Sequence, residues 1–152
     1  MTSQFPKISH VLELCLYAKH LPTTLAFYRD TLRLGPPVFH QPDRMAVFPL
    51  GQTSLLLFQR GETYSDWDAP HIENQIPGHG LPEGDMETKL RTHFALAVET
   101  PEDVDKWEEE LKEKGVKILG KADWPRGGRS VYFADPDEAC GEIVSRGIWP
   151  NY

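Results

Sequence analysis

The sequence has few cysteines, no excess of positive charge and no long apolar run, and each absence excludes a class of protein. Two cysteines in 152 residues, Cys15 and Cys140, are too few for a disulfide-stapled scaffold. A formal net charge of -7 argues against nucleic-acid binding, which usually requires a basic patch. No segment reaches membrane-spanning length, and the start, MTSQFPKISH, lacks the apolar centre of a signal peptide. We therefore expect a cytoplasmic protein that binds neither nucleic acid nor membrane.

The composition that remains is that of an ordinary folded domain, with 39% hydrophobic and 26% charged residues. Two segments carry the start and stop signals of helices. In the first, Pro22 suits an initial helical position and Gly35 suits a C-terminal cap. In the second, Thr100 can cap the helix, Pro101 follows it, and Asp103 completes a capping box. The predicted apolar faces are Leu25, Tyr28 and Leu32 in the first helix and Val104, Trp107 and Leu111 in the second.

The exposed face of the second helix carries oppositely charged residues four positions apart. Glu108 with Lys112, and Glu110 with Lys114, are expected to form solvated ion pairs.

Strand-like runs surround both helices in the same order, and this order indicates an internal repeat. His93 lies 80 residues after Glu13, and Gly115 lies 80 residues after Gly35. We infer two strand–helix–strand–strand–strand modules, residues 8–60 and 90–149, within one domain spanning 1–152. The expected strands are 11–18, 38–40, 44–49 and 53–59, followed by 93–98, 116–121, 129–134 and 139–145.

Residues 61–89, between the modules, show no periodicity and are rich in Gly, Pro and acidic residues. A loop this long is usually functional or a linker. The linker interpretation is adequate for most of it, and a lid carrying Trp67, His71 or His79 is the alternative.

Alternation along the strands places three ionisable side chains on the faces that turn away from the helices: Glu13, His93 and Glu142. Two carboxylates that share a buried site repel each other unless a cation neutralises both. If the two faces meet in a common cup, a divalent metal would relieve this cost, and three protein ligands leave positions open for water or substrate. The sequence therefore predicts a metal site with Glu13 and Glu142 as candidate catalytic carboxylates.

Each of these residues also has an ordinary structural interpretation. A strand glutamate is more often solvated, and a histidine at a strand start more often lies at the surface or in the core. The equivalent positions of Glu13 and His93 in the two modules favour the ligand interpretation.

The double strand–helix order, the helical segment AFYRDTLRLG and the ending YFADPDEACGEIV resemble the vicinal-oxygen-chelate superfamily. This superfamily includes glyoxalases, bleomycin resistance proteins and extradiol dioxygenases. The resemblance covers about residues 8–149, and in its last motif Glu138 and Ala139 replace the usual Gly-Asn. It implies an α+β fold in which the two modules form a cup-shaped, partly open mixed β-sheet barrel with the helices outside. It also implies a homodimer.

Carried over by position, the superfamily's metal ligands correspond to Glu13, His93 and Glu142, with a fourth within 55–57. All three residues at this fourth position are leucines, which is unlike a four-ligand glyoxalase or epimerase site. The Glu/His/Glu set also differs from the two-histidine sets of iron dioxygenases and fosfomycin-modifying enzymes.

The segment WPRGGRS offers candidate substrate-binding residues. Its two glycines let the backbone bend closely around a ligand, and Arg126 and Arg129 offer donors for a carboxylate or phosphate. Trp124 could form an apolar wall. A hairpin turn with solvated arginines, and ordinary packing of Trp124, are the alternatives.

Three functions follow from these observations. The first is a glyoxalase-like lyase or isomerase with one divalent ion (Zn, Ni, Mn, Mg or Fe) as the Lewis acid that polarises vicinal oxygens of a small carbonyl substrate. The second is a non-catalytic protein that binds a drug or metabolite, as bleomycin resistance proteins do. The third is an extradiol-type dioxygenase, which requires iron.

Overall fold

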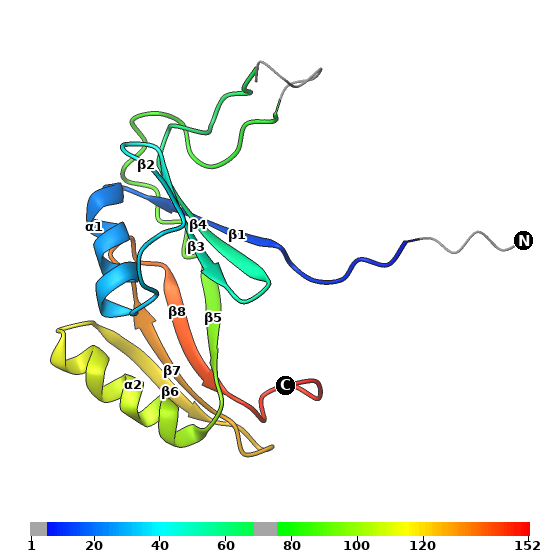
Figure 1. The fold of residues 1–152 in the computed structure, drawn as a ribbon. Coiled ribbons are helices and arrows are strands. Elements are labelled where there is room, and N and C mark those ends of the chain that lie inside the picture. The colour runs from blue at the N-terminus through cyan, green and yellow to red at the C-terminus, as the bar shows by residue number, and fades with distance from the viewer. Residues whose placement is uncertain (1–5, 69–75) are drawn as a thin grey trace, which may run out of the picture.

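The computed structural model describes residues 6–68 and 76–152 and contains two four-stranded mixed sheets with two helical segments. The first sheet has the order β1-β4-β3-β2, and the second has the order β5-β8-β7-β6. Figure 1 shows α1 and α2 on the same side of the molecule, with β1 and β5 near its centre. The predicted α+β class is confirmed, although the sheets do not close into a barrel within the described residues. The strands are β1 (Glu13–Ala18), β2 (Phe39–Gln41), β3 (Met45–Leu50), β4 (Thr53–Gln59), β5 (His93–Val98), β6 (Ile118–Asp123), β7 (Arg129–Ala134) and β8 (Cys140–Ser145).

The two modules repeat each other with the offset that the sequence predicts. β1 pairs in parallel with β4, as β5 pairs with β8, and the other neighbouring strands are antiparallel. Gly35 and Gly115 both adopt positive φ values, 77° and 71°, which favour glycine. The connection after the helix therefore turns in the same way in both modules.

The two helical segments differ in regularity. α1 (Leu21–Ala26) has the expected proline, Pro22, in its first turn and continues as the π-helical turn η1 (Phe27–Thr31). α2 (Pro101–Glu113) carries the predicted capping box, in which the Thr100 and Asp103 side chains bond each other's backbone amides. In both modules, the helix buries its apolar face against one side of the sheet.

Both predicted ion pairs of α2 form, Glu108 with Lys112 and Glu110 with Lys114, but the prediction that Glu108 is solvated is wrong. Glu108 is only 6% exposed, because its carboxylate bonds Lys112 on the same helix and Lys121 of β6, 2.5 Å away. Lys121 faces the helix because the β6–β7 register shifts between Ile118 and Gly120. A helical wheel cannot show a neighbouring strand, so the sequence pattern alone misplaces this glutamate.

A buried polar network joins the two modules of one chain. The Asp135 carboxylate accepts bonds from the Tyr28 hydroxyl (2.9 Å) and from the Asp137 and Ala139 amides (both 2.8 Å). Burial raises the pKa of Asp135. Asp137 in turn accepts bonds from the Lys19 amide and the Thr24 hydroxyl. The turn between β7 and β8 is thereby fixed against η1 and the start of α1.

No helix in the described ranges is long and apolar enough to cross a bilayer.

Candidate functional site

Glu142 lies at the middle of β8, on the sheet face that turns away from α2. Its side chain is only 4% exposed. One carboxylate oxygen, Oε2, lies 3.3 Å from His93 Nε2. The other, Oε1, is buried and has no hydrogen-bond partner within the part of the chain that the structure describes. Because a buried polar atom without a partner is costly, this oxygen marks a place where a ligand would be stabilised.

His93 begins β5, the strand that pairs with β8. Its Nδ1 lies 3.0 Å from the Cys140 carbonyl oxygen, which can only accept, so Nδ1 carries a proton. In the neutral imidazole Nε2, the atom that faces Glu142, is then the nitrogen with the free lone pair. The ring is about half exposed. An imidazole held in one tautomer beside a carboxylate is a typical half of a metal site.

Tyr132 on β7 is a neighbour that the sequence reasoning did not identify. It lies opposite Glu142 in the β7–β8 register, and its ring packs near His93 with centroids 6.2 Å apart. Burial, with a further contribution from the Glu142 carboxylate, raises the pKa of Tyr132. The sequence signal that could have identified Tyr132 is the alternation of residues 129–134, which, aligned antiparallel with that of 140–145, places Tyr132 on the same face as Glu142.

Glu13 lies at the start of β1, exposed on the corresponding face of the first sheet. The core-facing residues Leu16 and Ala18 alternate with it, as predicted. The chain does not bring Glu13 to His93 and Glu142: among residues 6–68 and 76–152, no three His, Cys, Asp or Glu side chains are grouped closely enough to hold a metal. We call the faces of the two sheets that turn away from the helices the open faces. Within one chain, the predicted ligands are therefore divided between them, with Glu13 on the first sheet and His93 and Glu142 on the second.

The fourth position of the superfamily pattern is occupied by Leu56. Parallel pairing sets Cys15 opposite Leu56, as it sets Ala95 opposite Glu142. Leu55 and Leu57 are fully buried on the core side. The first module thus presents leucine where the second presents its buried carboxylate.

A cavity of about 460 Å³ opens beside the His93–Glu142 pair. Its floor includes Ala95 and Ala97 of β5 and Val144 of β8, whose small or apolar side chains leave room above the sheet. The cavity is large enough for a small-molecule substrate. Its other wall comes from the chain end, which the sequence reasoning did not consider: Ile148, Trp149 and Tyr152.

The predicted substrate-binding residues lie on the β6–β7 hairpin. Arg129 already bonds two carboxylates on the helix side of the sheet, Asp105 at 2.6 Å and Asp123 at 2.7 Å. Arg126 is exposed in the turn. The Trp124 indole donates to the Ser130 hydroxyl at 2.8 Å, which anchors the hairpin. Of the two arginines, Arg126 is the one that remains available to an anionic group.

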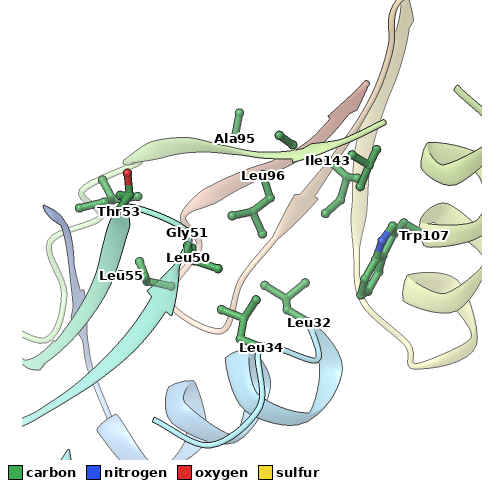
Figure 2. Close-up of a pocket in the computed structure, with 13 residues that line it drawn as sticks. Leu32, Leu34, Leu50, Gly51, Thr53, Leu55, Ala95, Leu96, Trp107 and Ile143 are labelled. Carbon is green, nitrogen blue, oxygen red and sulfur yellow. The ribbon is translucent and has the colours of Figure 1, made fainter. Parts of the chain in front are cut away.

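A larger cavity, of about 600 Å³, lies between the two modules. Figure 2 shows its apolar lining, with Leu32 and Leu34 after the first helix, Leu96 on β5 and Trp107 on α2 pointing toward the space. None of the predicted site residues lines this cavity. The residues that line it carry no ionisable side chain.

The described parts of the segment between the modules, 61–68 and 76–89, contact each other and the first module. Trp67 and Ile76 form a β-bridge, and the Arg44 guanidinium lies 5.7 Å from the centroid of the Trp67 ring. His71 lies outside the described residues. His79 lies on the open face of the first sheet, against Tyr17.

Comparison with known proteins gives consistent matches over most of the chain. The profile of the Glyoxalase/Bleomycin resistance protein/Dioxygenase superfamily matches residues 7–140. The metallothiol transferase FosB of Staphylococcus epidermidis is 29% identical over 132 residues, which cover 86% of this chain and 78% of FosB. The crystal structure of a lactoylglutathione lyase from Agrobacterium tumefaciens is similar, with a TM-score of 0.77 and 28% identity over 95% of this chain and 99% of that one. A Nocardioides protein of the same superfamily, with a TM-score of 0.66 and 20% identity over 97% of this chain and 91% of that one, shares the fold.

Proposed function

The chain belongs to the Glyoxalase/Bleomycin resistance protein/Dioxygenase superfamily, and on this premise we propose that it is a metal-dependent lyase or isomerase. The observation that carries the proposal is the buried Glu142 Oε1, which lacks a partner among the described residues and belongs to a carboxylate already in contact with His93. A carboxylate oxygen and an imidazole nitrogen suit first-row divalent ions. The residues therefore fit the metal that the superfamily implies.

In this proposal His93 and Glu142 hold the ion from the second module. The Cys140 carbonyl keeps the His93 ring oriented, and Tyr132 packs beside the pair. When bound, a divalent ion supplies Lewis acidity toward two neighbouring oxygens of a carbonyl substrate.

We propose that Glu13 completes the site from a second copy of the chain. Glu13 is exposed, and it forms no ion pair within the described ranges. In a symmetric dimer, the open face of the first sheet of each copy would meet the open face of the second sheet of the other copy. Two equivalent sites would form in this way. The Glu13 carboxylate, being the more accessible of the two, would then take a proton from the substrate carbon next to the carbonyl and return it to the neighbouring carbon.

The substrate class is proposed as a thiol adduct of a 2-oxoaldehyde. The names of the similar proteins, a lactoylglutathione lyase and a metallothiol transferase, support a thiol-containing substrate. The cavity beside His93 would receive its apolar part against Trp149. Arg126 is the candidate for an anionic group, and Trp124 would contribute through the hairpin that it anchors.

The test is metal content by elemental analysis of untagged protein, together with turnover of the methylglyoxal–glutathione adduct. About one divalent ion per active site is expected, reduced at least tenfold in Glu142→Gln and His93→Ala. Protein that takes up no divalent ion, even after reconstitution, would contradict the proposal.

Mixing two inactive variants tests the shared site. Glu13→Gln and Glu142→Gln proteins, unfolded and refolded together, should form mixed dimers with one intact site. Random pairing predicts recovery of about one quarter of the wild-type activity. No recovery, from mixed dimers verified by mass spectrometry, would show that the residues act within one chain or not together.

A second candidate is a non-catalytic binding protein, favoured by the apolar and aromatic lining of the cavity beside His93. It predicts binding of apolar metabolites without metal and unchanged by Glu142→Gln. A third, the dioxygenase, requires iron and would be excluded by full turnover without oxygen.

A further inference from the structure

His79 is held on the open face of the first sheet by a hydrogen bond to β1. Its Nδ1 lies 2.6 Å from the Tyr17 hydroxyl oxygen. Tyr17 shares this face with Glu13, the proposed ligand or base, at the other end of the same strand. The segment between the modules therefore delivers a second ionisable group to the face that the proposed function uses.

The ring of His79 packs against two aromatic side chains. Tyr17 and Phe58 stack across the β1–β4 pair with centroids 6.0 Å apart, and the His79 ring lies 5.7 Å from the first and 5.1 Å from the second. Phe58 is only 6% exposed, although it lies on the open face. This contact fixes the plane of the imidazole.

The backbone around His79 is fixed as well. Its amide donates to the Thr63 carbonyl at 2.7 Å, and its carbonyl accepts from the Thr63 hydroxyl at 2.9 Å. A Cβ at Gly80, where φ is +92°, would come within 2.5 Å of the Tyr17 ring, and a Cβ at Gly78 would overlap the backbone of Tyr64. Only glycines on both sides allow so close an approach. An exposed histidine that only packs on the surface does not need its ring and its backbone to be held in place so closely.

The free edge of the ring is the part that can reach a ligand. Burial raises the pKa of the Tyr17 phenol, so near pH 7 the phenol is a neutral donor to Nδ1. In the neutral imidazole the proton then resides on Nε2, which becomes a donor. No partner for Nε2 occurs in the described ranges, and the side chain is exposed.

The distance along β1 between Tyr17, which holds this donor, and Glu13 sets the length that a substrate must have to reach both ends of the site. Tyr17 is four residues from Glu13 on the same face, or about 13 Å along the strand. A small 2-oxoaldehyde cannot span that distance, whereas a peptide-like thiol adduct can.

We propose that His79, positioned by Tyr17, binds an oxygen acceptor at the end of the substrate remote from the metal. The acceptor is a carboxylate or amide carbonyl of an extended thiol. His79 is thus a specificity-determining residue that selects the thiol part of the substrate. This inference rests on the proposed function for the location of the reacting end, although the binding step can be tested alone.

The experiment compares two adducts of methylglyoxal, one with glutathione and one with 2-mercaptoethanol, which has no remote carboxylate. His79→Phe keeps an aromatic ring against Phe58 and removes both nitrogens. It should raise KM for the glutathione adduct about tenfold, with kcat little changed, and leave KM for the 2-mercaptoethanol adduct within about twofold. His79→Gln, which retains a donor, should restore part of the loss. An equal change for both adducts would overturn the proposal, since it would mean that His79 only supports the fold.

The matched control is His40→Phe, at an exposed histidine of β2, which should change neither KM. Melting temperature and metal content of the His79 variants should equal those of the wild type. Tyr17→Phe, which removes the hydroxyl that orients His79, should show a smaller rise in KM for the glutathione adduct alone.

Direct binding separates this proposal from the proposed function. S-methylglutathione has the carboxylates and amides of glutathione but no ketone or aldehyde at the reacting end, and its binding can be followed by calorimetry. Binding weakened about tenfold by His79→Phe and unchanged by Glu142→Gln supports the His79 site even if the protein takes up no metal. Absence of binding to the wild type, or binding independent of His79, overturns it.

Discussion

The two modules share their strand order and an 80-residue offset, yet their open faces carry different chemistry. The second module presents His93 and the buried Glu142. The first presents Glu13 and, in place of a second carboxylate, Leu56. The difference teaches that the core faces preserve the scaffold, whereas the open faces differ in the side chains that they offer to a ligand.

The first prediction concerns the turn that only the second module possesses. β3 and β4 are joined directly at Gly51 and Gln52, whereas the β7–β8 turn carries Asp135. Asp135→Ala removes the acceptor of two backbone amides and a buried hydroxyl. We expect a loss of about 2–4 kcal/mol in the free energy of unfolding, measured by urea denaturation.

The control for this prediction is Asp123→Ala, at a side chain that is 78% exposed. It should change the free energy of unfolding by no more than about 0.5 kcal/mol. Similar losses in the two variants would contradict the assigned role of the network.

The second prediction makes the modules more alike. Leu56→Glu introduces a carboxylate at the position equivalent to Glu142. It should tighten divalent-metal binding about tenfold, because one more oxygen ligand joins Glu13 in the proposed shared site. Titration with a metal-sensitive dye measures the affinity, and Leu56→Gln is the isosteric control. If Leu56→Glu binds the metal no more tightly than Leu56→Gln, position 56 does not belong to the metal site.

The third prediction concerns Glu108 of α2, whose carboxylate is buried beside β6. Bonds from Lys112 and Lys121 lower the pKa of Glu108. Because the pKa of Glu108 is lower in the folded state than in the unfolded state, its ionised carboxylate stabilises the fold at pH values above the ordinary glutamate pKa. This contribution is lost as the pH falls through the lowered pKa. Glu108→Gln should therefore cost about 1 kcal/mol at neutral pH and make the unfolding free energy less sensitive to acid at pH values below the ordinary glutamate pKa.

Glu110→Gln is the matched control, since Glu110 bonds Arg33 and Lys114 on the same helix but is more exposed. Its effect on the pH profile should be smaller. An equal effect would mean that burial beside β6 adds nothing.

The smallest effect is expected at Glu138, which occupies the usual glycine position of the superfamily motif. It adopts a φ of +64°, a conformation that disfavours any residue with a Cβ. Glu138→Gly should raise the melting temperature by about 2–4 °C, despite the loss of the exposed ion pair with Lys89. Glu138→Ala retains the strain and should give no such gain in a thermal scan.

The sequence by itself determined the elements, the repeat and the face on which each strand residue lies. Helix caps and strand alternation are local, so Thr100, Glu13 and His93 could be placed on their elements from neighbouring residues alone. The same alternation placed His93 and Glu142 on the faces that turn away from α2, and the parallel pairing of β5 with β8 in the structure puts them on one face of the same sheet.

Only the tertiary structure decided which of these faces meet. Glu13 is separate from His93 and Glu142, Glu108 is buried by a bulged strand, and His79 returns from a non-periodic segment to Tyr17. Each depends on residues distant in sequence, through the packing of one sheet beside another or the path of a loop. Periodicity specifies the direction of a side chain, but it carries no information on the distance to a group on another element.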